Sequence, residues 1–176
     1  MKKTQMLTLT GLCCALLCIA APVTLPIPIS PVPISLAPLA LFISSYILTP
    51  LQCFAGTVIY IMLGAVGLPV FSGFTGGVGI IAGPTGGFLL GYMGTALISS
   101  FFVHRYEKKY LHIMGMIVGM CISYFMGAVW FAFQQNVTFL TALTLCVIPY
   151  IAGDMIKIFI AVFIGEKLQK TVKKIH

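Results

Sequence analysis

Two ionisable residues interrupt an otherwise apolar stretch near the end of this sequence. Asp154 is the only acidic residue, and Lys157 the only basic one, that lies outside the charged flanks of the apolar segments. A spacing of three residues places both side chains on one face of a helix. Each costs about 2.5–3.5 kcal/mol to insert at the centre of a membrane helix, so such residues face a protein interior or a cavity. We interpret the pair as part of a ligand or ion site; the alternative is an ion pair that only holds helices together.

A glycine-rich stretch is the second feature with a chemical use. Residues 69–87 read PVFSGFTGGVGIIAGPTGG, and so many glycines between two prolines predict that residues 73–83 form no regular helix. Irregular backbone at membrane depth is tolerated only where it is buried in protein or lines a cavity, so we expect a lid or a cradle. Gly87 and Gly91 can equally serve close helix packing. The spacing matches neither a P-loop nor a dinucleotide-binding motif, so phosphate binding has no support.

No catalytic or metal-binding constellation can be recognised. The six cysteines fall in apolar segments, without a C-x-x-C pair or an adjacent histidine, so we expect them to pack as small hydrophobic side chains. The three histidines belong to charged flanks or to the terminus, and the serines of the apolar segments have no charged partner nearby in sequence. The sequence therefore predicts no enzyme, no metal and no cofactor.

These features belong to a membrane protein. Of the 176 residues, 60% are hydrophobic and only 7% are charged, and the mean hydropathy is +1.10, whereas a soluble domain carries about 25% charged residues. Two stretches free of charge, residues 4–103 and 110–153, are each far longer than the roughly 20 residues of one membrane-spanning helix. The net charge of +7 is concentrated at the ends of apolar segments, which is typical of cytoplasmic anchors in the bilayer and not of nucleic-acid binding.

The expected architecture is one all-α integral membrane domain over residues 1–176. Six membrane-spanning helices are predicted near residues 6–22, 35–48, 51–69, 86–103, 111–132 and 149–168. The last helix is placed from Pro149, because proline is favoured in a first turn, and an optional short helix over 137–147 precedes it. An even number of crossings puts all basic clusters on one side, so both termini are predicted to be cytoplasmic. The first segment also has the pattern of a secretory signal peptide, but we favour an uncleaved helix.

Two outer connections and the charged pair are expected to meet near the outer face. Residues 22–38 carry six prolines, which predicts an extended strap without internal hydrogen bonds. The other outer connection is the glycine-rich stretch. If the last helix begins at Pro149, Asp154 and Lys157 lie in its first turns, level with that stretch.

Three motifs occur in a fixed order along the chain. They are PVPISL at 31–36, LGAVGLPVFSGFTGGVGIIAGPTGGFLLGY at 63–92 and GDMIK at 153–157. This combination resembles the BioY family, the substrate-binding membrane subunits (S components) of biotin transporters of the energy-coupling-factor (ECF) type. The resemblance implies a six-helix S component in a bacterial cytoplasmic membrane. Such a subunit captures biotin from outside and works with a transmembrane coupling protein and a pair of ATPases. The resemblance also implies a partner-docking face at Gly11 and Ala15, and it leaves open whether the chain forms a homo-oligomer.

The resemblance matches the candidate residues to the chemistry of biotin. Asp154 would accept a hydrogen bond from a ureido N–H, and Lys157 would bind either the ureido carbonyl or the carboxylate, which the sequence leaves open. The usual family pattern P-V-P-I-T-L-Q is altered, with Ser35 for Thr and Ala37 for Gln, so position 37 is not included in the site. The candidate ligand-binding residues are Asp154, Lys157, Phe74, Gly76, Gly77, Thr85, Gly86 and Tyr92.

Other functions fit parts of this pattern. An S component for another vitamin would keep the architecture and change only the ligand. A solitary ion-coupled vitamin carrier usually needs intramembrane carboxylates for coupling, and this chain has one, beside a lysine. A purely structural bundle would leave the glycine-rich stretch unexplained. We therefore favour the biotin-binding subunit.

Overall fold

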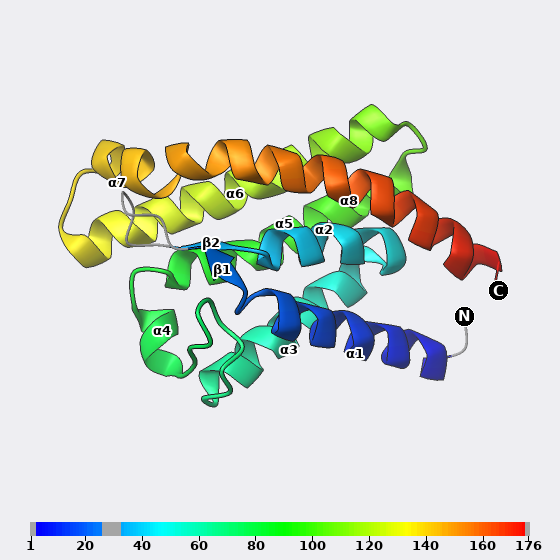
Figure 1. The fold of residues 1–176 in the computed structure, drawn as a ribbon, viewed down its shortest axis with the longest axis horizontal. Helices are drawn as coiled ribbons and strands as arrows, with labels where there is room; N and C mark the ends of the chain where they lie inside the picture. Colours follow the sequence, from blue (N-terminus) through cyan, green and yellow to red (C-terminus); the bar gives the residue numbers. More distant parts are fainter. Residues whose placement is uncertain (1–2, 26–32, 175–176) are drawn as a thin grey trace.

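The computed structural model describes residues 3–25 and 33–174, which form a helical bundle with one short hairpin (Figure 1). The helices are α1 (Lys3–Ala20), α2 (Ala37–Ile47), α3 (Pro50–Ala65), α4 (Val78–Ala82), α5 (Gly86–Arg105), α6 (Lys109–Gln135), α7 (Phe139–Cys146) and α8 (Ile148–Lys174). Strands β1 (Thr24–Leu25) and β2 (Ile34–Ser35) pair in antiparallel fashion between α1 and α2. Apart from this hairpin, the predicted all-helical fold is confirmed.

Three helical segments are long and apolar enough to cross a membrane. They are Gly86–Arg105, Lys109–Gln135 and Ile148–Thr171, and three shorter apolar helices cover Thr4–Ala20, Ala37–Ile47 and Pro50–Ala65. At 1.5 Å per residue, the shortest of these measures about 17 Å, against about 30 Å of hydrocarbon core. Each predicted helix thus overlaps an observed one, while six complete crossings stay a prediction.

Several helix ends differ from the predicted ones. α3 ends at Ala65 and not near residue 69, because Gly67 adopts a φ of 109° that breaks the helix. α8 begins at Ile148, with Pro149 in its first turn as expected, but it runs past residue 168 to Lys174. The optional short helix over 137–147 is α7, which Thr138 caps by accepting a hydrogen bond from the backbone N–H of Thr141.

The proline-rich strap differs from its expected form. Its two described ends pair with each other, Thr24 with Ser35 and Leu25 with Ile34. The expectation of a strap without internal hydrogen bonds is therefore wrong at these ends, where antiparallel pairing satisfies the backbone groups. The prolines between residues 26 and 32 lie outside the described residues.

The glycine-rich stretch contains a regular element that the sequence did not predict. Val78–Ala82 forms the five-residue helix α4, so the expectation of no helix between residues 73 and 83 is wrong there. Gly77, with a φ of 101°, precedes the helix, and Gly83 in an extended conformation ends it. Two glycines thus isolate a single turn of apolar residues.

Helices α5 and α6 form the most extensive helix pair of the bundle and approach closely at glycines. A Cβ atom on Gly91 would lie 2.5 Å from the Cα atom of Ser123, and one on Gly87 would lie 2.3 Å from the Cβ atom of Trp130. At both positions the structure supports the packing role, because only a missing side chain allows this approach.

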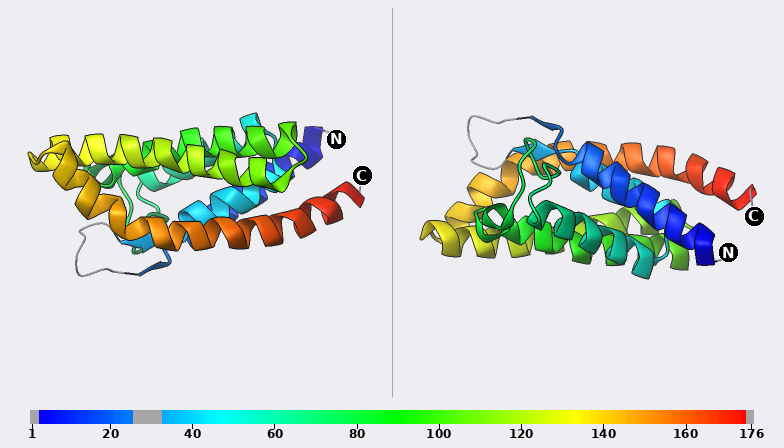
Figure 2. Two further views of the ribbon diagram at one scale, coloured as in Figure 1. Left: turned by 90° about the horizontal axis from the view of Figure 1, so that it is seen from above. Right: turned by 90° about the horizontal axis from the view of Figure 1, so that it is seen from below.

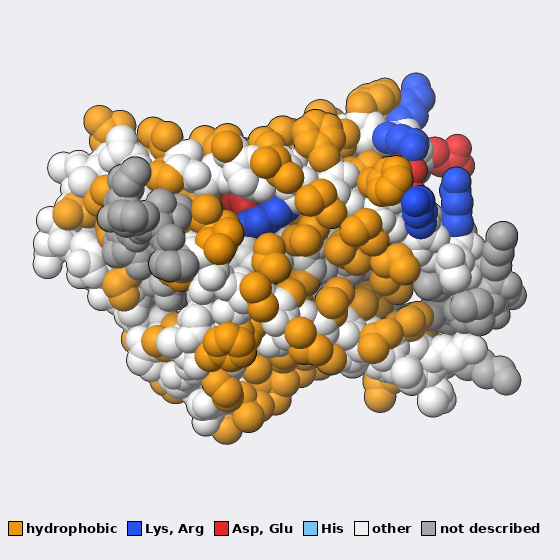
Figure 3. Space-filling model, in the orientation of Figure 1, with side chains coloured by type: hydrophobic (Ala, Val, Ile, Leu, Met, Phe, Trp, Pro, Cys, Tyr) orange, Lys and Arg blue, Asp and Glu red, His pale blue; other side chains and the backbone are white. Residues whose placement is uncertain are grey.

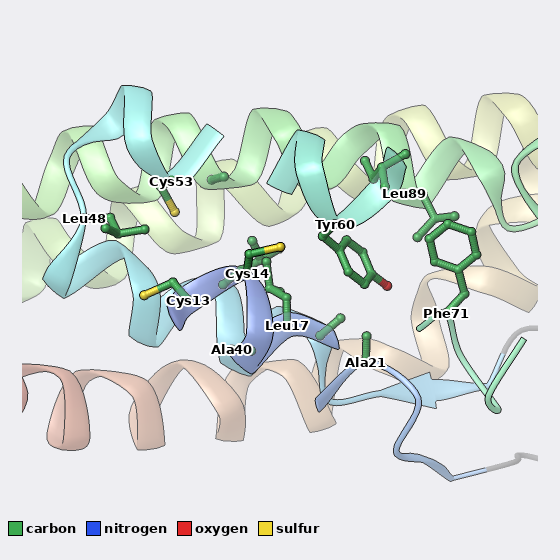
Figure 4. Packing of buried hydrophobic residues seen from close by; sticks show 14 residues of the cluster. Cys13, Cys14, Leu17, Ala21, Ala40, Leu48, Cys53, Tyr60, Phe71 and Leu89 are labelled. Atoms are coloured by element: carbon green, nitrogen blue, oxygen red, sulfur yellow. The ribbon is translucent and has the colours of Figure 1, made fainter. Parts of the chain in front are cut away.

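Figure 2 shows α5 and α6 along one side of the bundle and α8 along the opposite side. α2 packs between α5 and α8, and α3 packs against α5 and α1. Figure 4 shows the side chains of Cys13, Cys14 and Cys53 within the buried core that also contains Leu48 and Tyr60. These cysteines pack as small hydrophobic side chains, as expected, whereas Cys121 is exposed.

The two ends of the bundle have different chemical character. The α5–α6 connection and the last turns of α8 lie at one end, where Figure 3 shows the basic side chains gathered. α4 and α7 lie toward the other end (Figure 1). The glycine-rich stretch and the start of α8 therefore share the end that lies away from the basic side chains.

Candidate ligand-binding site

Asp154 and Lys157 form a buried ion pair on one face of α8. Their side chains are 7% and 9% exposed, and the Lys157 Nζ atom lies 2.7 Å from Asp154 Oδ1. Lys157 Nζ also donates to the backbone oxygen of Ser35 on β2, at 2.6 Å. The hydroxyl of Tyr124 on α6 donates to Asp154 Oδ2 at 2.5 Å. Each carboxylate oxygen therefore has its own donor, and the ammonium bridges α8 to the hairpin.

The pair faces a cavity of about 240 Å³. Its walls come from the hairpin, the glycine-rich stretch and helices α2 and α4 to α8. The lining residues are Pro33, Ser35, Pro38, Phe71, Ser72, Thr75, Ile80, Thr85, Phe88, Leu89, Tyr92, Thr95, Met120, Ser123, Tyr124, Cys146, Tyr150, Asp154 and Lys157. Most of this lining is apolar or aromatic, with the charged pair on one wall. Such a concave, mainly apolar site with a few polar groups is the usual form of a small-molecule site.

Four of the eight predicted ligand residues line this cavity. Asp154, Lys157, Thr85 and Tyr92 face it from α8 and from the start of α5. The i, i+3 spacing thus places both charges on one face, as predicted. The pair thus opens onto a cavity and is not fully enclosed between packed helices.

The predicted aromatic residue of the glycine-rich stretch is not in the lining. Phe74 is 69% exposed and has a φ of 58°, whereas Phe71 is 1% exposed and lines the cavity. A bridge between Phe71 and Thr75 closes a tight loop with Phe74 near its tip. Phe71 turns inward because its ring packs edge-on against Tyr60 in a space left open by Gly64.

The three predicted glycines also lie outside the cavity lining. A Cβ atom on Gly76 would lie 2.2 Å from the backbone oxygen of Leu68, and one on Gly86 would lie 1.7 Å from that of Ile81. Gly77 has a φ of 101°, which side chains rarely adopt. These glycines shape the backbone that carries the lining residues, and direct contact with a ligand stays a prediction for them.

Two side chains of α6 hold the glycine-rich stretch in place. Trp130 Nε1 donates to the backbone oxygen of Gly83 at 2.9 Å, and Gln134 Nε2 donates to that of Ala82. On the other side, the backbone N–H of Gly77 donates to Gly64 of α3 at 2.6 Å. The stretch is thus anchored to two helices, which fixes the cavity wall that it forms.

Sequence reasoning missed the contribution of Tyr124 and of the hairpin. Tyr124 lies on a different helix, 30 residues from Asp154, so nothing in local spacing links them. Ser35 entered the sequence argument only as a departure from a motif, yet its backbone oxygen binds Lys157, and its hydroxyl donates to Ala21. The signal that could have found Tyr124 is its position in the middle of a long apolar helix, where a tyrosine hydroxyl needs a hydrogen-bond partner.

The site has the chemistry of a binding pocket for a polar small molecule. Its carboxylate can accept hydrogen bonds, its ammonium can meet a carbonyl or an anion, and its aromatic walls can bury a ring. Within the described residues, no group of three or more His, Cys, Asp or Glu side chains could hold a metal ion.

Comparison with known proteins assigns the family. The family model described as the BioY family matches residues 1–174. The chain belongs to the BioY family. The biotin transporter BioY2 of Lactococcus lactis is 32% identical over 94% of this chain and 91% of its own length. A probable biotin transporter BioY of Pyrococcus horikoshii is 34% identical over 95% of this chain and 98% of its own length.

A solved structure agrees with this assignment. It is described as the S component for biotin from an ECF-type ABC transporter. It superposes with a TM-score of 0.88 and 28% sequence identity, covering 96% of this chain and 93% of its own. The chain is therefore a member of a family of membrane transport proteins, and not of a family of enzymes.

Proposed function

We propose that this chain is the biotin-binding S component of an ECF transporter and holds biotin at Asp154 and Lys157 without a cofactor of its own. The observation that carries the proposal is a buried carboxylate and ammonium, 2.7 Å apart, on one wall of a largely apolar cavity. Biotin needs an acceptor for its ureido N–H groups, a cation for a carbonyl or carboxylate, and an apolar wall for its bicyclic ring. The named biotin transporters and the solved S component support the same ligand.

Equilibrium binding of labelled biotin to the detergent-purified protein tests this proposal. Asp154→Asn and Lys157→Ala are each expected to weaken binding at least tenfold, because each removes a charge-assisted hydrogen bond from a buried site. Lys109→Ala is the matched control, since it removes a lysine from the exposed ion pair with Glu166. Unchanged affinity in both site variants would refute the site, and a wild type that ignores biotin would refute the function.

The group of biotin that meets Lys157 can be identified with an ester. If Lys157 binds the carboxylate, biotin methyl ester binds the wild type less tightly than biotin does, and Lys157→Ala abolishes that difference. If Lys157 binds the ureido carbonyl, the variant loses affinity for the acid and for the ester alike.

The alternatives from the sequence are tested in the same assay. Competition by riboflavin or thiamine, with no effect of unlabelled biotin, would favour an S component for another vitamin. A solitary ion-coupled carrier is disfavoured, because Lys157 and Tyr124 already engage both oxygens of Asp154, the only carboxylate outside the charged flanks. Uptake of biotin by proteoliposomes that contain this chain alone, driven by a proton or sodium gradient, would reverse that preference.

The proposal includes partner subunits and an orientation. Gly11 and Ala15 are exposed on α1, and a Cβ atom on Gly11 would meet nothing within 4 Å. We assign this surface to the coupling protein of an ECF module, in a bacterial cytoplasmic membrane that the chain crosses six times with both termini inside. Gly11→Leu and Ala15→Leu are expected to retain biotin binding and to abolish co-purification with the coupling protein and its ATPases. Loss of biotin binding in these variants would contradict a separate docking surface.

A further inference from the structure

The carboxylate of Asp154 lies between two hollows of the bundle. One is the cavity described above, and the other is an apolar groove of about 340 Å³ between α6, α7 and α8. Met120, Tyr124 and Asp154 line both hollows. The remaining lining of the groove is apolar except for Cys121, so an acidic group that turned toward it would find no donor there stronger than a thiol. Something must therefore keep the carboxylate turned toward the cavity.

Tyr124 has the geometry to do this. Its hydroxyl donates to Asp154 Oδ2 at 2.5 Å, while Lys157 Nζ binds Oδ1 at 2.7 Å. The two donors come from different helices, α6 and α8, so together they fix the rotation of the carboxylate about its terminal bond. With the Lys157 contact alone, Oδ2 would border the apolar groove without a partner, and an unpaired charge in such surroundings is costly.

A carboxylate held in this way is ready for a ligand. An oxygen of an ionised carboxyl group can accept more than one hydrogen bond, so each oxygen of Asp154 can accept a ligand N–H in addition to its protein donor. Fixing the acceptor before binding lowers the entropy cost of binding, because the side chain does not have to be ordered by the ligand. The ring of Tyr124 contributes separately, as a wall between cavity and groove.

We propose that Tyr124 is a positioning residue of the ligand site: its hydroxyl holds Asp154 in the orientation that accepts the ligand's N–H groups. This role rests on the proposed function, since it concerns how the same site recognises biotin. Tyr124→Phe is the informative substitution, because it removes the hydroxyl and keeps the ring between the two hollows. Tyr46→Phe is the matched control: Tyr46 is a buried tyrosine whose hydroxyl pairs with a side chain, His112, outside the cavity lining.

The sequence allows the carboxylate to be observed directly. Asp154 is the only aspartate in the chain, so protein labelled with carboxyl-¹³C aspartate gives one carboxyl signal by NMR or infrared spectroscopy. The experiment combines this signal, recorded without ligand, with the Kd for labelled biotin, both measured on the full chain in detergent. Tyr124→Phe is expected to shift the Asp154 signal and to weaken biotin binding about tenfold, the usual effect of losing a hydrogen bond to a charged group. Tyr46→Phe is expected to change neither.

Each other outcome overturns the proposal. A weaker Kd with an unmoved Asp154 signal would mean that Tyr124 contacts the ligand itself and does not act through Asp154. A shifted signal with an unchanged Kd would mean that the orientation of the carboxylate has no part in binding. If the wild type binds biotin and Tyr124→Phe matches it in both measurements, only the role of Tyr124 fails. If the wild type does not bind biotin, the proposed function fails and takes this role with it.

Discussion

Removing the ammonium of Lys157 should cost more stability than removing both charges of the ion pair. In Lys157→Met, the carboxylate of Asp154 stays buried with only the hydroxyl of Tyr124 as a partner. Breaking a buried pair in this way costs about 3–5 kcal/mol. We expect the lower end, about 3 kcal/mol, because the Tyr124 hydrogen bond is retained. In Asp154→Asn/Lys157→Met no charge is left in the interior, and the main loss is the charge-assisted hydrogen bond to Ser35, about 1.5 kcal/mol.

Unfolding in mixed micelles can measure this difference. Increasing SDS unfolds the protein, and the fluorescence of Trp130, the single tryptophan, reports the transition. The double variant should be more stable than Lys157→Met by about 1.5 kcal/mol, the difference between the two losses above. The matched control is Lys109→Met, which breaks an exposed pair with Glu166 and should cost less than about 1 kcal/mol.

One outcome would refute this reasoning. If the double variant is as unstable as Lys157→Met, an uncompensated charge is not the source of the loss, and the stability derives from the packing of the lysine stem. Both variants should bind biotin at least tenfold more weakly than the wild type, so in the double variant stability is largely kept while affinity is lost. A double variant that unfolds like the wild type and fails to bind would show that the pair serves the ligand more than the fold.

Two further predictions concern α6 and its neighbours. Gly87→Ala should destabilise the protein by about 1–3 kcal/mol in SDS titrations, because its Cβ atom would lie 2.3 Å from Trp130 and force α5 and α6 apart. Gly153→Ala, whose Cβ atom meets nothing within 4 Å, should be neutral or slightly stabilising, and equal losses would contradict the packing argument. Trp130→Phe removes the donor to Gly83 and should speed amide hydrogen exchange about fivefold across the glycine-rich stretch. Unchanged exchange would refute this anchor.

The sequence predicted the parts of the structure that depend on its few charged residues and its long apolar segments. Charged residues are rare in this chain, so an acid and a base three residues apart could face only a protected interior, and both line the cavity. Long runs without charge marked the helices, and proline marked the start of the last one. In these cases a single strong physical cost, the burial of charge or of an unpaired backbone group, decides the outcome.

The choice of aromatic residue in the glycine-rich stretch could not be predicted in this way. Phe71 and Phe74 lie three residues apart in the same apolar surroundings of the sequence. Phe71 points inward because Gly64, near the end of the preceding helix α3, leaves room for its ring beside Tyr60. That choice depends on how the chain folds back onto α3 after Gly67, and the residue types around Phe71 and Phe74 do not encode this turn. α4 was missed for a related reason, since only the backbone angles of its flanking glycines isolate a single helical turn.

The contacts around Lys157 connect the cavity with the first helix. Lys157 binds the backbone oxygen of Ser35, and the hydroxyl of Ser35 donates to the backbone oxygen of Ala21, directly after the last residue of α1. Under the proposed function, a ligand group would accept a hydrogen bond from the same ammonium beside Asp154 and Ser35, since an ammonium has three N–H donors. The ammonium of Lys157 would thus bind the ligand and also tie the hairpin to α8, and the hairpin directly follows the helix that carries Gly11 and Ala15. Ser35 therefore lies between the ligand site, whose wall it helps to form, and the proposed docking helix.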